Sequence, residues 1–353
     1  MRRRDFVLGA LGTGALTSLA PLAVKAATPP GVIPYGAAIR TEAMLEDPVY
    51  RQAVIEHCQI VVSEGNLKWF DVRPDRDTFD FARSDLLMDF AEEHGMEMRG
   101  HTLVWYAANP EWVEAIASPE EARTELVRHI ETVVQHYGER VRSWDVVNEP
   151  LADFPTKDAP YRDSVWLRHL GPDYIELALR TAHAAAPHAQ LVINEFDIEQ
   201  PTDKSRAKRK AVLDLVSDLK ARGAPLHAIG LQGHLQGDIA IDKPGLTSFV
   251  AELTAMGMPV LVTELDVIDN LLPGPIAERD AMVAGRARDF LEAIGAAARP
   301  EAVITWGLSD LHTWVPIWFS RADGLPNRPL PLDVTFEPKP LMRVIQDFTR
   351  SST

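Results

Sequence analysis

The feature that most constrains the fold of this chain is a regular alternation of strand-like and helix-like segments, eight of each, after about residue 30. The strand-like segments are short apolar runs rich in β-branched residues, at 32–39, 60–63, 96–104, 141–147, 190–193, 228–235, 260–264 and 302–305. Between them lie amphipathic stretches that predict helices, such as 85–94, 119–137, 172–186, 202–222, 277–298 and 340–349. This alternation predicts parallel strands with crossover helices, and eight such units close a (β/α)8 TIM barrel, an α/β fold.

An open, doubly wound sheet is the alternative fold. It is less well supported because no Gly-rich phosphate-binding loop follows any of the strand-like segments. No Pro-, Gly- or Ser-rich linker divides residues 30–350, so we expect residues 27–353 to form a single domain.

Charge and cysteine content exclude several kinds of partner and site. The net charge of −15 repels phosphate backbones and anionic membrane surfaces, so we expect no nucleic-acid partner. Cys58 is the only cysteine, which excludes an intramolecular disulfide and any metal site built from cysteines.

Residues 1–26 have the pattern of an export signal. An arginine cluster at positions 2–4 and Phe6 precede a Gly/Ala/Leu stretch, and we expect cleavage after Ala26. The arginine pair resembles the twin-arginine type, which predicts a periplasmic or secreted protein. The alternative is a short membrane anchor retained in the mature protein. No later window is long and apolar enough to span a bilayer, so we expect no membrane contact after cleavage.

Two strand-like segments lead into carboxylates. The segment 141–147 is followed by Asn148 and Glu149, and the segment 260–264 ends in Glu264, with Asp266 just beyond. An ionised group at the tip of a buried strand is costly to desolvate unless a specific partner stabilises it. Either glutamate alone could simply begin a solvated loop, but the pair indicates a site.

Other strands lead into polar and aromatic residues, which converge on one face of a barrel. These are Glu64, Lys68, His101, Trp105, Asn194, Gln232, His234, Trp306 and Trp314. Indole faces stack on sugar rings, and amides, histidines and lysine satisfy the hydroxyls, so the set is typical of a saccharide site. Taken singly, the tryptophans and histidines are equally typical of core residues.

Cleavage of a glycosidic bond needs one carboxyl group to protonate the leaving oxygen and a second to act as nucleophile or base. Glu149 and Glu264 suit these roles. The chain also resembles the family-10 glycoside hydrolases, the endo-β-1,4-xylanases, from about residue 35 to about residue 348. The motifs that carry the resemblance are Arg-Gly-His-Thr-Leu-Val-Trp at 99–105, Trp-Asp-Val-Val-Asn-Glu-Pro at 144–150, Gln-Gly-His-Leu at 232–235, Thr-Glu-Leu-Asp at 263–266 and Trp-Gly-Leu-Ser-Asp-Leu-His-Thr-Trp at 306–314.

The resemblance implies a role for each matching residue. Glu149 would be the general acid/base and Glu264 the nucleophile of a retaining enzyme. Asn148 would bind the 2-hydroxyl of the attacked sugar, and His234, held by Asp266, would keep Glu264 ionised. The remaining strand-tip residues, Glu64, Lys68, His101, Trp105, Asn194, Gln232, Trp306 and Trp314, would bind substrate, most of them on the non-reducing side.

The chain departs from the family pattern in three places. Gly65 stands where Asn is usual, with Asn66 displaced by one position. Tyr106 and Ala108 stand where His and Gln are usual, and the fifth strand leads into Asn-Glu-Phe-Asp at 194–197 in place of Asn-Asp-Tyr-Asn. We expect these changes to weaken binding of short unsubstituted oligosaccharides and to admit larger substituents.

The sequence thus predicts a retaining endo-β-1,4-xylanase that acts on xylan or xylo-oligosaccharides, as a monomer and without metal or cofactor. Three alternatives stay open. They are a β-1,4-glycosidase for cello-oligosaccharides or aryl glycosides, a barrel that binds oligosaccharide without cleaving it, and a divalent-metal hydrolase, for which no His-x-His or His-Glu-x-x-His spacing is present.

Overall fold

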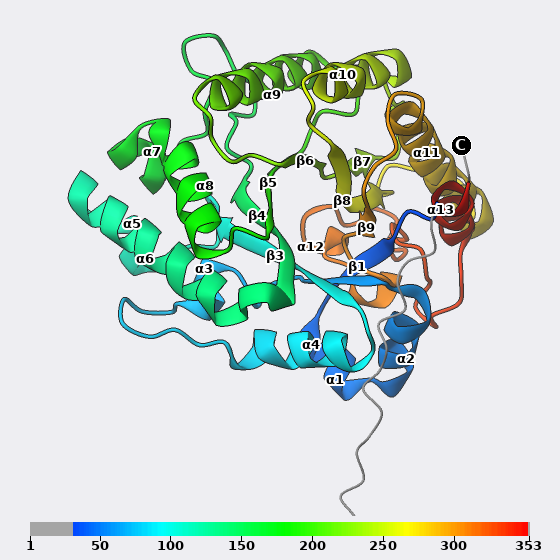
Figure 1. Cartoon of the computed structure of the whole chain (residues 1–353). Coiled ribbons are helices and arrows are strands. Elements are labelled where there is room, and N and C mark those ends of the chain that lie inside the picture. The colour runs from blue at the N-terminus through cyan, green and yellow to red at the C-terminus, as the bar shows by residue number, and fades with distance from the viewer. Residues whose placement is uncertain (1–30, 352–353) are drawn as a thin grey trace, which may run out of the picture.

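The structure is a computed structural model of the chain, and it describes residues 31–351. Eight parallel strands form a closed barrel, which confirms the predicted fold (Figure 1). The strands are β1 (Tyr35–Ile39), β2 (Ile60–Ser63), β3 (Glu97–Val104), β4 (Val141–Asn148), β5 (Gln190–Glu195), β6 (Ala228–Leu231), β8 (Val260–Ile268) and β9 (Val303–Thr305). The spatial order is β6-β5-β4-β3-β2-β1-β9-β8, and pairing of β6 with β8 closes the barrel. The expected export signal at 1–26 lies outside the described residues.

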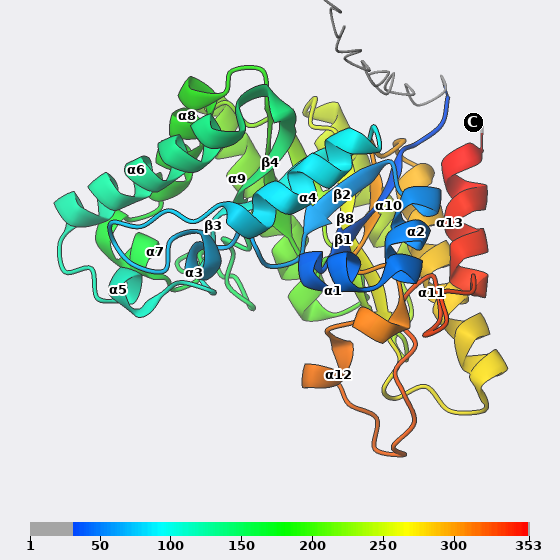
Figure 2. The same ribbon diagram turned by 90° about the horizontal axis from the view of Figure 1, so that it is seen from below.

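Helices surround the barrel (Figures 1 and 2). The longer ones are α2 (Pro48–His57), α4 (Ala82–Glu93), α6 (Pro119–Tyr137), α8 (Asp173–Ala185), α9 (Asp203–Ala221), α10 (Lys243–Ala255), α11 (Ile276–Gly295) and α13 (Pro340–Arg350). Side-chain caps begin four of them, α2, α6, α9 and α10. For example, Ser118 accepts from the backbone N–H of Glu121 in α6, and Thr202 accepts from that of Ser205 in α9. Short helices lie in the connections, namely α1 (Thr41–Glu46), α3 (Trp69–Val72), α5 (Glu111–Glu114), α7 (Val165–Leu170) and α12 (Val315–Trp318). None of the helices in the described part of the chain is long and apolar enough to cross a bilayer.

The predicted strand 228–235 is in fact two strands. It breaks after β6 and resumes as β7 (His234–Gln236) because Gly233 adopts a φ of 77°. This left-handed conformation interrupts the ladder and is cheap only for glycine. β7 then pairs with the second half of β8, which places His234 opposite Asp266.

The predicted strand 260–264 is too short. β8 continues to Ile268, so Glu264 lies within the strand and not at its end. The pairing of β8 with β9 shifts register between Val262 and Leu265, beside Glu264. The irregularity lies beside a carboxylate in a strand that is buried along its whole length.

Two apolar cores support the barrel. The larger fills the space between the strands and the helices. The smaller fills the barrel interior, and its members are Ala38, Ile60, Val62, Val192, Ala228, Leu261, Ala302, Ile304 and Trp306, with Trp314 packed against them. Trp306 closes this interior core and also lines the cavity described below.

Candidate active site

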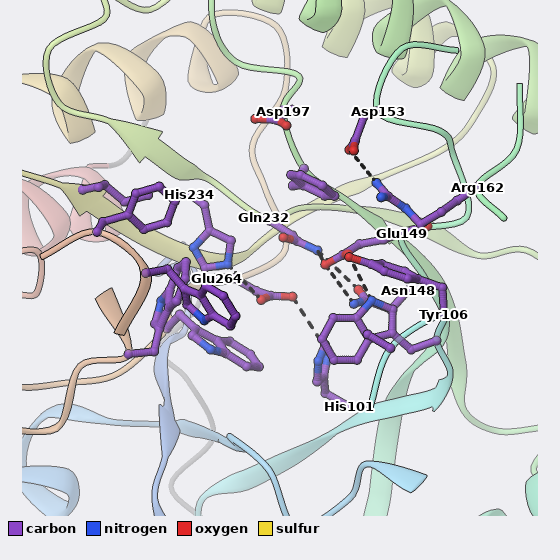
Figure 3. Close-up of a pocket in the computed structure, with 18 of the residues that line it drawn as sticks. His101, Tyr106, Asn148, Glu149, Asp153, Arg162, Asp197, Gln232, His234 and Glu264 are labelled. Carbon is purple, nitrogen blue, oxygen red and sulfur yellow. Dashed lines mark hydrogen bonds and ion pairs between the residues drawn. The ribbon is translucent and has the colours of Figure 1, made fainter. Parts of the chain in front are cut away.

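A cavity of about 820 Å³ lies at the carboxyl ends of the strands. It is lined by all but two of the predicted site residues: Glu64, Lys68, His101, Trp105, Asn148, Glu149, Gln232, His234, Glu264, Trp306 and Trp314. Figure 3 shows Glu264 near the middle, with His234 on one side and Glu149 on the other. The other two, Asn194 and Asp266, are fully buried and do not line the cavity, so they act on the residues that do.

Glu149 follows the last residue of β4 in a left-handed conformation, with a φ of 55°. Its backbone N–H donates to the carbonyl of Asn194 over 2.8 Å, which fixes this turn. One carboxylate oxygen, Oε1, accepts from Gln232 at 2.9 Å and from Asn148 at 3.2 Å. The other, Oε2, accepts from the indole N–H of Trp105 at 3.0 Å. These three donors are neutral.

Glu264 has a different environment. Its Oε2 lies 3.2 Å from Nε2 of His234, and its Oε1 lies 3.9 Å from Nδ1 of His101. Burial raises the pKa of Glu264, but the charge of His101 together with the hydrogen bond and charge of His234 outweighs it and holds the pKa below its ordinary value. Glu264 is therefore held ionised, as a nucleophile must be.

His234 is held in turn by Asp266, whose Oδ1 lies 2.9 Å from Nδ1 of the ring. The other oxygen of Asp266 accepts from the indole N–H of Trp314 at 2.8 Å. Burial lowers the pKa of His234, but Asp266 first and Glu264 second raise it well above its usual value. The imidazolium thus lies between two carboxylates and donates to both.

Buried amides connect the two glutamates. The Asn194 amide N–H donates to Glu264 and, at 2.9 Å, to the side-chain oxygen of Asn148, whose own amide N–H donates to Glu149. Thr263 orients this amide by donating to its oxygen over 2.6 Å. A Cβ at Gly230 would collide with the same oxygen, so glycine is needed there for Asn194 to take this position.

His101 is positioned by residues that the sequence reasoning missed. Its Nδ1 lies 2.9 Å from Asp145, a fully buried residue of β4 that also binds the guanidinium of Arg99 through both oxygens. Burial raises the pKa of Asp145, but Arg99 and His101 hold it below its usual value. A charged residue between Trp144 and Val146, in the buried part of a strand, was the available signal for Asp145.

A second group of residues forms one wall of the cavity. The ammonium of Lys68 lies 5.0 Å from the ring centre of Trp105 and 5.4 Å from that of Trp306. Burial lowers the pKa of Lys68, opposed by Glu264, Glu64 and Glu149. Glu64 is fixed by Arg40, which donates to both of its oxygens at 2.9 and 3.1 Å.

The family departures lie in different places. Neither Gly65 nor Ala108 lines the cavity, although a Cβ at Gly65 would meet nothing within 4 Å. The displaced Asn66 is buried and donates to Asp71 at 2.7 Å, so it does not replace the missing amide. Tyr106 does line the cavity, stacked under the guanidinium of Arg162 at 4.4 Å.

The end of the cavity beyond Glu149 contains two cations that the sequence did not single out, Arg162 and Lys204, beside Phe196 of the altered fifth-strand segment. Arg162 donates to the backbone carbonyl of Glu149 at 3.2 Å and to Asp153 at 2.9 Å. Phe196 and Lys204 line the same end, with the ammonium 5.6 Å from the ring centre. Arg162 lies in polar, irregular sequence and Lys204 lies at the start of α9, and neither position carried a signal of a site.

The residues that line this site do not form a metal centre. Across residues 31–351, no group of three or more His, Cys, Asp and Glu side chains is placed to hold a metal ion.

The model of glycosyl hydrolase family 10 matches residues 23–348. The chain belongs to this family. The β-1,4-xylanase of Dictyoglomus thermophilum is 33% identical over 302 residues, which cover 82% of this chain and 82% of that protein. The crystal structure of xylanase 10B from Thermotoga petrophila, in complex with xylobiose, superposes with a TM-score of 0.81 at 31% identity and covers 90% of this chain and 94% of that one.

Two longer relatives are 32% identical to this glycosyl hydrolase over 329 residues, or 89% of its length. They are endo-1,4-β-xylanase A of Thermoanaerobacterium saccharolyticum and exoglucanase XynX of Acetivibrio thermocellus. The match covers 27% of the first and 28% of the second, so the chain spans about a quarter of their length.

Proposed function

We propose that this glycosyl hydrolase is a retaining endo-β-1,4-xylanase that hydrolyses xylan or xylo-oligosaccharides through a covalent glycosyl-enzyme intermediate. The observation that carries the proposal is the contrast between the two carboxylates of one cavity. Glu264 is held ionised by His101 and His234, whereas Glu149 has only neutral hydrogen-bond donors. Glycosidases distinguish the acid from the nucleophile by placing the two carboxyl groups in different environments, so that their pKa values differ.

The reaction follows from this assignment. Glu264 attacks the anomeric carbon while Glu149 protonates the departing glycosidic oxygen, so the bond to the leaving sugar breaks as the bond to Glu264 forms. Glu149, now ionised, takes a proton from water, and the water oxygen displaces Glu264. The amide of Asn148 lies beside both groups, where it is placed to bind the 2-hydroxyl of the attacked sugar.

The walls of the cavity support a sugar substrate. Trp105, Trp306 and Trp314 present indole rings, and Lys68, Gln232 and Glu64 offer polar groups between them. The solved relative that binds xylobiose supports xylan as the polymer. A β-1,4-glucan is the second candidate substrate, because one relative is named an exoglucanase.

The test is release of reducing sugar from xylan, cellulose and mixed-linkage glucan, each with and without a chelator. Xylan should be the preferred substrate, with no effect of the chelator. Proton NMR of the first product should show the β-anomer, because two displacements retain configuration. Preference for cellulose would favour the second candidate, and the α-anomer as first product would exclude the retaining mechanism.

We further propose that the enzyme is exported and acts as a monomer in the periplasm or outside the cell. The twin-arginine pattern in residues 1–26 supports export. Fractionation of cells that produce the full chain, compared with an Arg3→Lys/Arg4→Lys variant, tests the location, and sedimentation velocity tests the monomer.

A further inference from the structure

α12 brings an exposed indole to the edge of the catalytic cavity. Trp318, the last residue of this helix, is 76% exposed and lines the cavity. Its neighbour Ile317 is 68% exposed but is not among the cavity residues. Figure 2 shows α12 projecting away from the barrel.

The Trp318 ring is free to receive a ligand, unlike the other two indoles on this side. Trp314 donates its N–H to Asp266, and Trp306 packs into the barrel interior. In the described part of the chain, no protein ring stacks on Trp318 and no protein group binds its indole N–H. A large aromatic ring left in water is a surface whose burial by a ligand is favourable.

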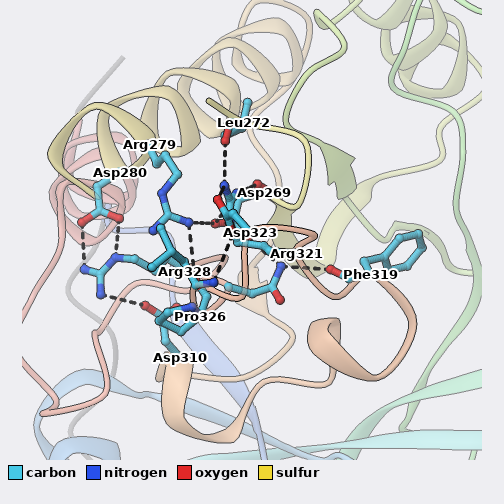
Figure 4. A network of polar contacts seen from close by, with 12 residues as sticks. Asp269, Leu272, Arg279, Asp280, Asp310, Phe319, Arg321, Asp323, Pro326 and Arg328 are labelled. Carbon is cyan, nitrogen blue, oxygen red and sulfur yellow. Dashed lines mark hydrogen bonds and ion pairs between the residues drawn. The ribbon is translucent and has the colours of Figure 1, made fainter. Parts of the chain in front are cut away.

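The segment after α12 is held in place by buried polar contacts (Figure 4). The side-chain amide of Asn327 donates to the carbonyl of Phe319 at 3.1 Å and to Asp269 at 2.9 Å. Arg321 donates to the backbone carbonyl of Asp269 and, at 3.0 Å, to that of Leu272. These contacts tie the residue next to Trp318 to the end of β8.

Further ion pairs fix the same connection to α11. Arg279 lies 3.3 Å from Asp269, and Arg328 donates to both oxygens of Asp280 at 2.8 Å. A ligand that binds a segment held in this way does not need to order it first, so little of the binding free energy is lost.

We propose that Trp318 is a stacking platform for a xylopyranosyl ring at the α12 end of the cavity, beyond Trp314. This inference rests on the proposed function and adds a substrate contact to those that the sequence predicts. We assign the ligand of Trp318 as a sugar ring of the substrate because Trp318 lines the same cavity as Glu149 and Glu264. The equatorial hydroxyls of β-xylopyranose leave both ring faces lined with C–H groups, which match an indole face.

The test compares chain lengths in two variants. Trp318→Ala removes the platform, and Ile317→Ala is the matched control, an equally exposed residue of the same helix outside the cavity. kcat/KM is measured on xylohexaose and on 4-nitrophenyl β-xylobioside, and the ratio of the two is the readout. We expect this ratio to fall about 5- to 10-fold in Trp318→Ala through a higher KM on xylohexaose, to stay unchanged in Ile317→Ala, and to recover largely in Trp318→Phe.

An unchanged ratio in Trp318→Ala, or an equal fall in Ile317→Ala, would show that Trp318 does not stack on the substrate. Xylohexaose binding by calorimetry, in a Glu264→Ala background that cannot turn over, should weaken by the same factor. If the wild-type enzyme does not hydrolyse xylan, the proposed function is wrong. The same ratio on cellohexaose and an aryl cellobioside then decides separately whether Trp318 stacks on the substrate.

Discussion

Nε2 of His234 lies 3.2 Å from Oε2 of Glu264, while the other nitrogen of the same ring lies 2.9 Å from Asp266. The relationship arises from the break in the sixth strand, because β7 pairs with the outer half of β8 only after Gly233 has turned the chain. It lets one imidazolium keep the nucleophile ionised, and it explains why the two carboxylates of the site differ.

The roles that we propose for Glu149 and Glu264 should be distinguishable by leaving group. With 2,4-dinitrophenyl β-xylobioside, Glu149→Ala should still form the intermediate, because dinitrophenolate needs no proton, but deglycosylation should slow by about 10²- to 10⁴-fold. Azide should restore turnover and yield a glycosyl azide. Glu264→Ala should stay inactive with and without azide. If the two variants behave alike, the assignment of Glu149 as acid/base and Glu264 as nucleophile is wrong.

Loss of His234 should move the acidic limb of the pH profile. Glu264 must be ionised to attack, and His234 helps to hold its pKa low, so in His234→Gln that pKa rises. The acidic limb of kcat/KM should shift to higher pH by about one to two units. The exposed His188→Gln is the control, with no shift expected. A lower kcat/KM with an unmoved limb would mean that His234 only shapes the cavity.

The family departures should have unequal effects. Gly65 lies between the cavity residues Glu64 and Lys68, and its Cβ position is open, so Gly65→Asn can direct an amide toward the sugar. One added hydrogen bond, worth about 0.5–1.5 kcal/mol, should raise kcat/KM on xylotriose roughly 2- to 10-fold. Ala108 does not line the cavity and has a φ of 55°, so Ala108→Gln should leave the value unchanged. The reverse pattern would place Ala108 at the substrate.

Glu199 should make the fold less stable as pH rises. Its carboxylate accepts from the backbone N–H groups of Ile198 at 2.8 Å and Gly233 at 3.2 Å, and burial raises its pKa to about 7. Because the folded-state pKa is the higher one, its stabilising contribution is complete below the ordinary pKa of 4.5 and is lost as pH rises to about 7. The loss is on the order of 3 kcal/mol.

Urea unfolding of Glu199→Gln at pH 5 and pH 8 tests this expectation. Relative to the wild type, the variant should gain stability between the two values, since it has no charge to bury. The exposed Glu252→Gln is the control and should follow the wild type at both values. A constant difference between Glu199→Gln and the wild type would show that Glu199 is already ionised at pH 5.

The sequence by itself predicted the barrel, because eight apolar runs alternating with amphipathic stretches leave few other ways to bury both kinds of surface. It also placed Glu149 and Glu264 on one face, since parallel strands present their carboxyl ends together. The bounds of helices α2 and α10 were not given and the break at Gly233 was not predicted, because short or weakly periodic segments take their form from the neighbours they pack against.

Tertiary structure alone decided which polar side chains touch one another. Asn194 has the pattern of a sugar ligand in the sequence, yet it lies beneath the cavity and joins Asn148 to Glu264. Asp145 and Arg162 hold His101 and the backbone of Glu149, respectively, across distances of 44 and 13 residues in the chain. Such contacts depend on side-chain directions at the tips of different strands, to within a few tenths of an ångström. Periodicity determines which face a residue occupies, but only the packed barrel sets the hydrogen bond that it makes there.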